Sequence, residues 1–238
     1  MPPRLGSLNE FCWMDLKTRD LPGTAAFFAE TLGWRFAVDE GDWRKATKIA
    51  TGGHSIGGVS DLANPVYPSR TPAHVSYYLA VDDVDRRTEA ATELGARVVV
   101  APFDAGDQGR TATLVDPMGA AFSLWQPRRF TGWTFPPHLA GAPHRMVLAC
   151  DQPDEARHFY RQAMGTPPEC ADFVAPDGSD PAAPRWELVV GVDEPHHVAG
   201  RAQDQDRDTS TWFDEAGRPV ARISSPEGLT FQVRRMRP

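Results

Sequence analysis

The sequence predicts an α+β fold built from a repeated unit of one strand, one helix and two or three further strands. One observation is a recurring helix ending in which Leu or Met precedes a glycine: FFAETLG (27–33), EAATELG (89–95) and FYRQAMG (159–165). A second is a hairpin pattern, Gly-Arg followed by Pro-x-Gly-x-x-Phe, at 109–126 and 217–234. Because recurrence at a regular spacing is the signature of repeated modules, we expect related units along the whole chain.

Each helix candidate has a start, a stop and a strand before it. Residues that favour a helix start stand ahead of the three candidates: Asp20 with Pro22, Asp83, and Gln152 with Pro153 and Asp154. The glycine after each candidate suits the left-handed conformation that ends a helix. The preceding runs, at 11–18, 75–81 and 145–150, are expected to be strands.

A domain boundary is predicted in 128–143, where Pro and Gly are frequent and no periodicity is sustained. The domains are then 1–127 and 144–238, and the shorter spacing of motifs in the second makes it the smaller. We expect its missing residues around 176–184 and 195–208, as a clipped hairpin and a short helix after Pro195.

Composition excludes several classes of protein. The 238 residues carry a formal net charge of −7 with scattered basic residues, which is not the pattern of a nucleic-acid-binding or anionic-membrane-binding protein. Three distant cysteines, Cys12, Cys150 and Cys170, predict neither a disulfide framework nor a cysteine zinc site. With neither a signal peptide nor a run long enough to span a bilayer, a cytoplasmic protein is expected.

Three segments carry a family resemblance: FCWMDLKTRD then AAFFAETLGW (11–34), VSYYLAVDDVD (75–85) and GRTATLVDPMGAAFSLWQP (109–127). They resemble the glyoxalase/bleomycin-resistance/dioxygenase group, the vicinal oxygen chelate superfamily. The chain is most similar to tandem-domain members labelled glyoxalase-like or hydroxylase. The resemblance implies four βαβββ-type modules paired into two glyoxalase-like domains, the last modules shortened, with the strands of each domain curled around an open cup.

The resemblance also implies a divalent metal in the cup, held by His, Gln or Glu of the first and last strands of the modules. In the first domain these positions fall on Trp13, Ser76 and Ser123, with Gly57 as the counterpart of Ser123, and none of these side chains is a competent ligand. We therefore expect no metal or other cofactor there.

In the second domain the same positions fall on Arg145, Glu187 and Gln232, with His144 beside the first. Arg145 stays cationic and cannot be a ligand. His144, Glu187 and Gln232 form the alternative metal set. The simpler interpretation is that Arg145 and Glu187 pair with each other or face solvent.

The inward positions of the first domain predict an aromatic pocket with a few orienting polar groups, because such a lining suits flat aromatic or cationic organic molecules. The candidate ligand-binding residues are Trp13, Asp15, Ser76, Tyr78, Ser123 and Trp125. The same side chains could instead simply fill the core.

The favoured hypothesis is a small-molecule-binding protein that works without a metal. The alternative is a metal-dependent glyoxalase-type lyase, dioxygenase or hydroxylase with an atypical site. In a third hypothesis one domain only supports the other. A homodimer is compatible with all three, and the sequence leaves open whether any reaction is catalysed.

Overall fold

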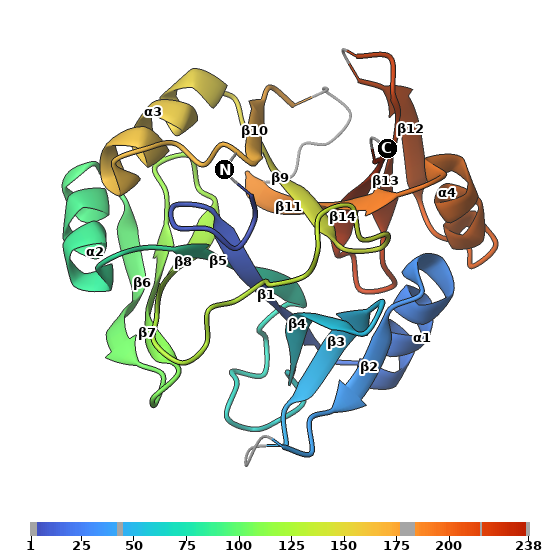
Figure 1. Ribbon diagram of the computed structural model, residues 1–238, viewed down its shortest axis with the longest axis horizontal. Coiled ribbons are helices and arrows are strands. Elements are labelled where there is room, and N and C mark those ends of the chain that lie inside the picture. The colour runs from blue at the N-terminus through green and yellow to red at the C-terminus, as the bar shows by residue number, and fades with distance from the viewer. Residues whose placement is uncertain (1–3, 42–44, 177–183, 215, 237–238) are drawn as a thin grey trace. The chain divides into compact units, whose positions relative to one another are not determined.

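The computed structural model describes residues 4–41, 45–176, 184–214 and 216–236. The described chain is mixed α+β, with two sheets and four helices, as predicted (Figure 1). The first module consists of β1 (Phe11–Thr18), α1 (Leu21–Leu32), β2 (Arg35–Val38), β3 (Thr47–Thr51) and β4 (His54–Asp61). The second repeats this order in β5 (His74–Ala80), α2 (Val84–Glu93), β6 (Arg97–Asp104), β7 (Gly109–Val115) and β8 (Ala121–Pro127).

The third and fourth modules differ in length. The third comprises β9 (Pro143–Ala149), α3 (Pro153–Met164) and β10 (Ala171–Val174). The fourth comprises β11 (Arg185–Val192), α4 (Pro195–Gln203), β12 (Thr209–Phe213), β13 (Pro219–Ser224) and β14 (Thr230–Arg235). The short helix expected after Pro195 is therefore present, and it belongs to a module that keeps all its strands.

The predicted helix ends are confirmed by backbone geometry. The Asp20 carboxylate accepts a hydrogen bond from the Gly23 N–H at 3.0 Å, which satisfies one of the donors at the start of α1. Gly33 ends α1 in the left-handed conformation at φ +72°, and Gly165 ends α3 at φ +86°. Only glycine adopts such angles without steric cost, so these positions mark the module repeat in the sequence.

The sheet orders reveal where the shortening occurred. They are β2-β3-β4-β1-β5-β8-β7-β6 and β10-β9-β11-β14-β13-β12. In the first module β4 runs parallel to β1, and β10 runs parallel to β9 in the same way. Strand β10 is thus the last strand of the third module. In the described chain, no hairpin like β2–β3 stands between α3 and β10.

The lost hairpin therefore falls at 165–170, before β10, and not around 176–184 as predicted. Residues 177–183 of that predicted location lie outside the described part of the chain. The spacing between the turn glycines of the two halves shows how many residues the second half lacks. It does not show whether they are missing before or after β10. This is the physical reason for the misplacement.

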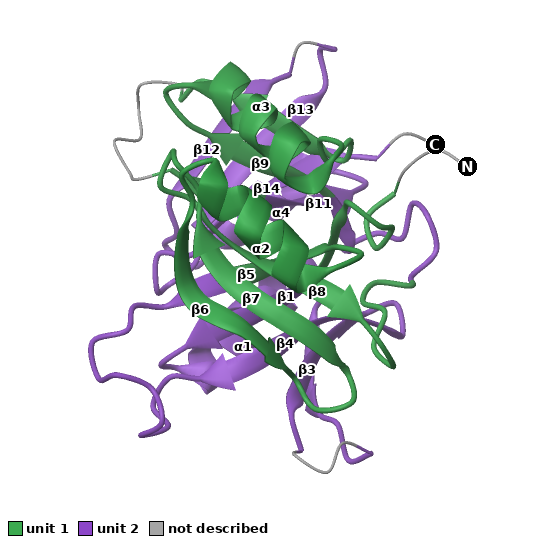
Figure 2. Cartoon of the chain, turned by 90° about the vertical axis from the view of Figure 1, so that its left-hand side faces the viewer, with its two compact units in different colours: residues 1–13, 76–134, 145–187 green, residues 14–75, 135–144, 188–238 purple. Residues whose placement is uncertain are grey.

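The chain packs as two compact units, shown in different colours in Figure 2: residues 1–13, 76–134 and 145–187 form unit 1, and residues 14–75, 135–144 and 188–238 form unit 2. Each unit draws on both halves of the sequence. The domains predicted at 1–127 and 144–238 stay a prediction.

Unit 1 has a core of aromatic side chains between its strands and α3. The ring of Phe122 lies 5.2 Å from that of Tyr160, and Tyr160 lies 5.3 Å from Trp186. All three are less than 5% exposed, so their burial contributes several kcal/mol of hydrophobic stabilisation. The backbone of α3 is also tied to α2, where the Arg87 guanidinium donates to the Ala163 carbonyl at 3.4 Å.

Unit 2 has a second aromatic core. Phe28 of α1 stacks on Trp34 at 4.9 Å and contacts Phe231 of β14 at 5.5 Å. The Arg201 guanidinium of α4 donates to the Thr31 carbonyl near the end of α1 at 2.8 Å. The first and fourth modules therefore share one core in this unit.

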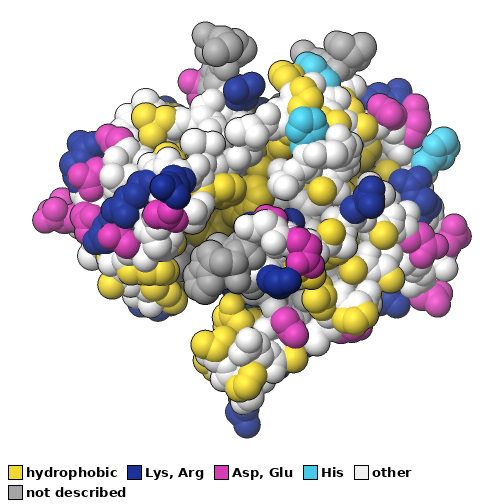
Figure 3. Space-filling model, turned by 60° about the horizontal axis from the view of Figure 1, so that its bottom comes forward, with side chains coloured by type: hydrophobic (Ala, Val, Ile, Leu, Met, Phe, Trp, Pro, Cys, Tyr) yellow, Lys and Arg dark blue, Asp and Glu magenta, His cyan; other side chains and the backbone are white. Residues whose placement is uncertain are grey.

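No helix within the described ranges is long and apolar enough to cross a membrane. On the face drawn in Figure 3, basic and acidic side chains are interspersed among apolar ones. This mixed surface is what the scattered charges of the sequence predict.

Candidate ligand-binding face

Two cross-strand rows of side chains build one face of unit 1. In the first row, Tyr78 of β5 pairs with Ser123 of β8, Ser123 with Thr113 of β7, and Thr113 with Val100 of β6. Paired residues of neighbouring strands point to the same side of a sheet. The row therefore presents three hydroxyl groups and ends in an apolar side chain that is 41% exposed.

The second row runs beside the first. Trp125 of β8 pairs with Ala80 of β5 and with Thr111 of β7, and Thr111 pairs with Phe103 of β6. Both Val100 and Phe103 reach the same side because the register between β6 and β7 shifts twice between Val98 and Phe103. We call these two rows, together with Trp13 and Phe130, the aromatic face.

Aromatic rings meet at right angles at one end of this face. The ring of Trp13 lies 4.7 Å from Phe130 at an interplanar angle of 86°, and Trp125 lies 5.9 Å from Phe130 at 74°. Tyr78 meets Trp125 at 6.2 Å and 90°. Edge-to-face contacts of this kind are favourable beyond the area they bury. The cluster therefore combines large apolar walls with a fixed geometry.

The polar groups of the face are held in place. The hydroxyls of Thr113 and Ser123 share a hydrogen bond of 2.9 Å, and the Thr111 hydroxyl donates to the Leu124 carbonyl at 2.8 Å. The Trp125 indole N–H donates to the Phe130 carbonyl at 3.0 Å. These oriented groups can select the orientation of a polar substituent on an otherwise apolar molecule.

Five of the six predicted ligand-binding residues belong to unit 1. Trp13, Tyr78, Ser123 and Trp125 belong to the aromatic face, and Ser76 lies two residues before Tyr78 on the same side of β5. Whether these residues bind a ligand stays a prediction. Phe130 was missed because it lies in the segment assigned as a linker, and the aromatic residues of RFTGWTF (129–135) were the available signal.

The sixth predicted residue, Asp15, belongs to unit 2. Its carboxylate accepts hydrogen bonds from the Lys17 ammonium at 2.6 Å and from the Ser60 hydroxyl at 2.8 Å. Lys17 also lies over the ring of Tyr67, with the ammonium 5.6 Å from the ring centre. Asp15 is therefore part of a half-buried ion pair, a setting that its position in the sequence did not reveal.

The donor set of the aromatic face does not fit a divalent metal. Its first-strand and last-strand positions hold an indole and hydroxyl groups, and the Ser123 hydroxyl is engaged by Thr113. The predicted counterpart of Ser123 in the first module, Gly57, is wrong by one residue. Gly58 pairs with Asp15, whereas a Cβ on Gly57 would meet Met14 on the opposite side of β1. Glycine offers no ligand atom at either position.

The alternative metal set divides between the units. His144 of β9 and Gln232 of β14 belong to unit 2, and Glu187 of β11 belongs to unit 1. The described residues hold no group of three or more His, Cys, Asp or Glu side chains that could bind a metal ion. Because the alternative set includes a glutamine, it stays a prediction.

The predicted pairing of Arg145 with Glu187 is wrong. The Arg145 guanidinium donates to both carboxylate oxygens of Asp172, at 2.7 and 3.2 Å, while Glu187 lies 3.4 Å from Arg185. Because β10 runs parallel to β9, Asp172 lies on the neighbouring strand. The sequence did not reveal this neighbour because the position of the lost hairpin was not recognised.

All three cysteine thiols are buried. Burial raises the pKa of Cys12, of Cys150 and of Cys170, the last to about 12. The thiols therefore stay protonated at neutral pH, and only the thiolate is an effective nucleophile.

A buried carboxyl group lies on the other side of unit 1. The Asp116 carboxylate accepts hydrogen bonds from the Ala120 N–H at 2.8 Å and from the Tyr160 hydroxyl at 2.9 Å. The Trp186 indole in turn donates to the Tyr160 oxygen at 2.8 Å. Burial raises the pKa of Asp116 above its ordinary value. Tyr160 lies 44 positions from Asp116 in the sequence, so no local pattern reveals this contact.

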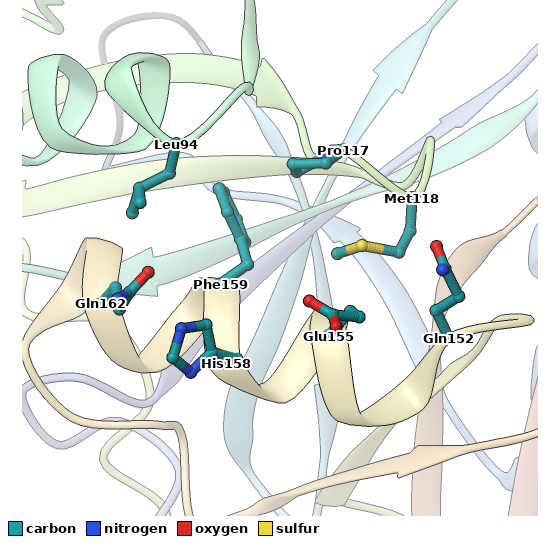
Figure 4. Close-up of a pocket in the computed structure, with 8 residues that line it drawn as sticks. All are labelled: Leu94, Pro117, Met118, Gln152, Glu155, His158, Phe159 and Gln162. Carbon is teal, nitrogen blue, oxygen red and sulfur yellow. The ribbon is translucent and has the colours of Figure 1, made fainter.

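Two of the surface cavities formed by the described residues lie within single units, and neither of these two is lined by a predicted ligand-binding residue. The cavity of about 320 Å³ in unit 1 separates Leu94, Pro117 and Met118 from residues of α3 (Figure 4). The cavity of about 290 Å³ in unit 2 borders α4 and includes His197 and Arg201. Both are bordered by exposed polar side chains.

Comparisons with known proteins agree with this architecture. Residues 13–125 match the model of a family described as a glyoxalase-like domain. The chain is 27% identical, over 93% of its length and 92% of the relative's, to "Putative glyoxylase CFP32" of Mycobacterium tuberculosis. It is 29% identical, over 77% of its length and 73% of the relative's, to the anthracycline biosynthesis protein DnrV of Streptomyces peucetius.

Two solved structures show the same fold at low sequence identity. The Mn(II)-bound glyoxalase of Novosphingobium aromaticivorans is 11% identical, with a TM-score of 0.64 over 96% of this chain and 82% of that one. Homoprotocatechuate 2,3-dioxygenase of Brevibacterium fuscum is also 11% identical, with a TM-score of 0.64 over 98% of this chain and 81% of that one.

Proposed function

We propose that the chain is a member of the glyoxalase/bleomycin-resistance/dioxygenase superfamily, the vicinal oxygen chelate proteins, and that it binds a small organic molecule on the aromatic face without a metal. The observation that carries this proposal is the pair of cross-strand rows in unit 1. They join aromatic rings, oriented hydroxyls and an exposed apolar end on one side of the sheet. That composition suits a ligand site better than a metal centre.

The size of the face indicates the class of ligand. Neighbouring strands lie about 4.8 Å apart, so the three strands from Trp125 through Thr111 to Phe103 span roughly 10 Å. A planar system of two to four fused rings has this extent. Phe103 is 48% exposed, so such a molecule would cover an apolar side chain that water now contacts. The name of the relative DnrV, an anthracycline biosynthesis protein, supports a polycyclic aromatic ligand.

Metal-dependent chemistry is the alternative function. The name of one structural neighbour, a Mn(II)-bound glyoxalase, supports this alternative. The residues that could supply ligand atoms are His144, Glu187 and Gln232. Lyase, dioxygenase and hydroxylase activities all belong to this alternative, and it predicts that removal of metal abolishes ligand binding.

The experiment is a binding screen of planar aromatic molecules against the chelator-treated protein, monitored by tryptophan fluorescence and repeated by calorimetry. Trp13→Ala should weaken binding at least tenfold while the circular dichroism spectrum stays unchanged. Trp212→Ala, at an exposed position of β12 in unit 2, serves as the matched control and should bind normally. Equal affinity in wild type and Trp13→Ala, for every ligand found, would show that the ligand does not bind on the aromatic face.

A further inference from the structure

A short strap follows β8 and lies over the aromatic face. We define it as residues 128–133. It is anchored at one end by N–H groups of Arg128 and Phe130, which donate to the Gln108 carbonyl at 3.0 and 3.1 Å. At the other end the Trp133 N–H donates to the Cys12 carbonyl at 2.8 Å. All of these residues belong to unit 1.

The second anchor is tightly fitted. Gly132 has a φ of +87°, and a Cβ placed on it would lie 2.4 Å from the Cys12 carbonyl oxygen. Trp133 is only 4% exposed. Only residues 131 and 132 lie between the two anchors, so displacement of Phe130 also requires its N–H to release the Gln108 carbonyl.

Phe130 offers two groups to the same part of the face. Its ring makes edge-to-face contacts with Trp13 at 4.7 Å and with Trp125 at 5.9 Å. Its carbonyl oxygen accepts the hydrogen bond of the Trp125 indole N–H at 3.0 Å. The phenyl ring of Phe130 thus packs against both indole rings, while its carbonyl oxygen accepts the hydrogen bond of the Trp125 indole N–H.

The exposed fractions of the side chains show that Phe130 covers the two indole rings. Trp13 and Trp125 are 9% and 7% exposed, whereas Phe130 keeps an intermediate exposure. The two indoles come from strands of the sheet, and Phe130 comes from an irregular segment. Displacement of Phe130 would expose two indole rings and one indole N–H. It would break the Phe130 N–H bond to the Gln108 carbonyl but no pairing between strands of the sheet.

We propose that Phe130 occupies the ligand position on the aromatic face, and that the ligand is an aromatic ring bearing a carbonyl oxygen, such as an aryl ketone or a quinone, which displaces it. The inference rests on the proposed function and adds to it the chemical group next to the ring. The ligand carbonyl takes the place of the Phe130 carbonyl on the Trp125 indole. Because the strap must open first, the apparent dissociation constant exceeds the intrinsic one by the reciprocal of the open fraction.

The test compares acetophenone with ethylbenzene, which has the same size but no carbonyl oxygen, by ligand-observed NMR titration of the full chain. Phe130→Ala removes the competing ring, so it should bind acetophenone at least tenfold more tightly than wild type. Trp125→Phe removes the indole N–H, so it should lose the preference for acetophenone over ethylbenzene. Phe213→Ala, at a residue 68% exposed in unit 2, is the matched control and should behave like wild type.

A second readout uses the unaltered protein. Saturating acetophenone should abolish the nuclear Overhauser effect between the Phe130 and Trp13 rings and shift the Trp125 indole resonance. Equal or weaker binding by Phe130→Ala, with the Overhauser effect retained in the complex, would overturn the displacement and make Phe130 a wall of the site. In that case the proposed function survives, provided that Trp13→Ala still weakens binding. If neither wild type nor Phe130→Ala binds any aromatic probe, the displacement and the proposed function both fail.

Discussion

Removal of one hydroxyl group, by Tyr160→Phe, should destabilise the protein strongly. The Tyr160 oxygen donates to the buried Asp116 carboxylate and accepts from the Trp186 indole N–H, and the Tyr160 side chain is fully buried. The variant leaves both partners in the core without this hydrogen bond. A hydrogen bond to a charged group contributes about 1.5–3 kcal/mol, and a buried donor without a partner costs about 1–3 kcal/mol. We expect the free energy of unfolding to fall by about 2–4 kcal/mol.

The loss should depend on pH. Burial raises the pKa of Asp116, so the folded state holds this proton more tightly than the unfolded state does. The stability that this proton contributes is fully present below the unfolded value of about 3.9, and it is lost as pH rises through the raised native value. The hydrogen bond from Tyr160 lowers the Asp116 pKa and so opposes this effect. The difference between wild type and Tyr160→Phe should therefore be smallest below about pH 4 and grow as Asp116 ionises.

The assay is urea unfolding followed by tryptophan fluorescence and circular dichroism between about pH 3 and 8. Tyr67→Phe is the matched control, because Tyr67 is only half-buried, and it should change the free energy of unfolding by less than about 0.5 kcal/mol. Asp116→Asn should remove the pH-dependent part of the difference. A loss by Tyr160→Phe that equals the control, or that is largest at acid pH, would refute the description of this network.

Three further substitutions test the packing. Gly132→Ala would place a Cβ 2.4 Å from the Cys12 carbonyl and at a positive φ, so thermal melting should show a loss above about 2 kcal/mol. Gly200→Ala, inside α4 with open space around it, should instead raise stability by about 0.5–1 kcal/mol. Glu227→Ala removes the carboxylate that accepts from the Thr18 hydroxyl and from a backbone N–H, and urea unfolding should show a loss of about 1–2 kcal/mol. A neutral Gly132→Ala, a destabilising Gly200→Ala or an unchanged Glu227→Ala would each contradict the corresponding contact.

The helix ends and the hairpin turns were predictable because neighbouring residues in the sequence determine them. Asp20 and Gly33 mark the ends of α1 through backbone donors and a left-handed angle, which neighbouring residues decide. The turns that hold Gly119 and Gly228 set the last hairpins in the same way. The lost hairpin before β10 was misplaced because a deletion leaves no residue to mark its position.

The site was predictable only in part, because its composition depends on long-range contacts. Alternation along a strand predicts the side of Ser123 and Trp125 but not the partner that covers them. Phe130 lies in a segment without periodicity, and its role depends on its contacts with Trp13 and Trp125. The same limit explains why the partner of Arg145 was assigned as Glu187 and proved to be Asp172.

The most direct test of metal-independent binding on the aromatic face is the affinity for an aromatic ligand before and after chelation. Metal content is determined on the purified protein, after exhaustive EDTA treatment, and after incubation with Zn, Ni, Mn, Fe or Mg ions, and the ligand is titrated into each sample. Metal-independent binding predicts the same dissociation constant in every sample, with affinity at least tenfold weaker in Trp13→Ala. Stoichiometric metal whose removal abolishes binding would contradict it and direct attention to His144, Glu187 and Gln232.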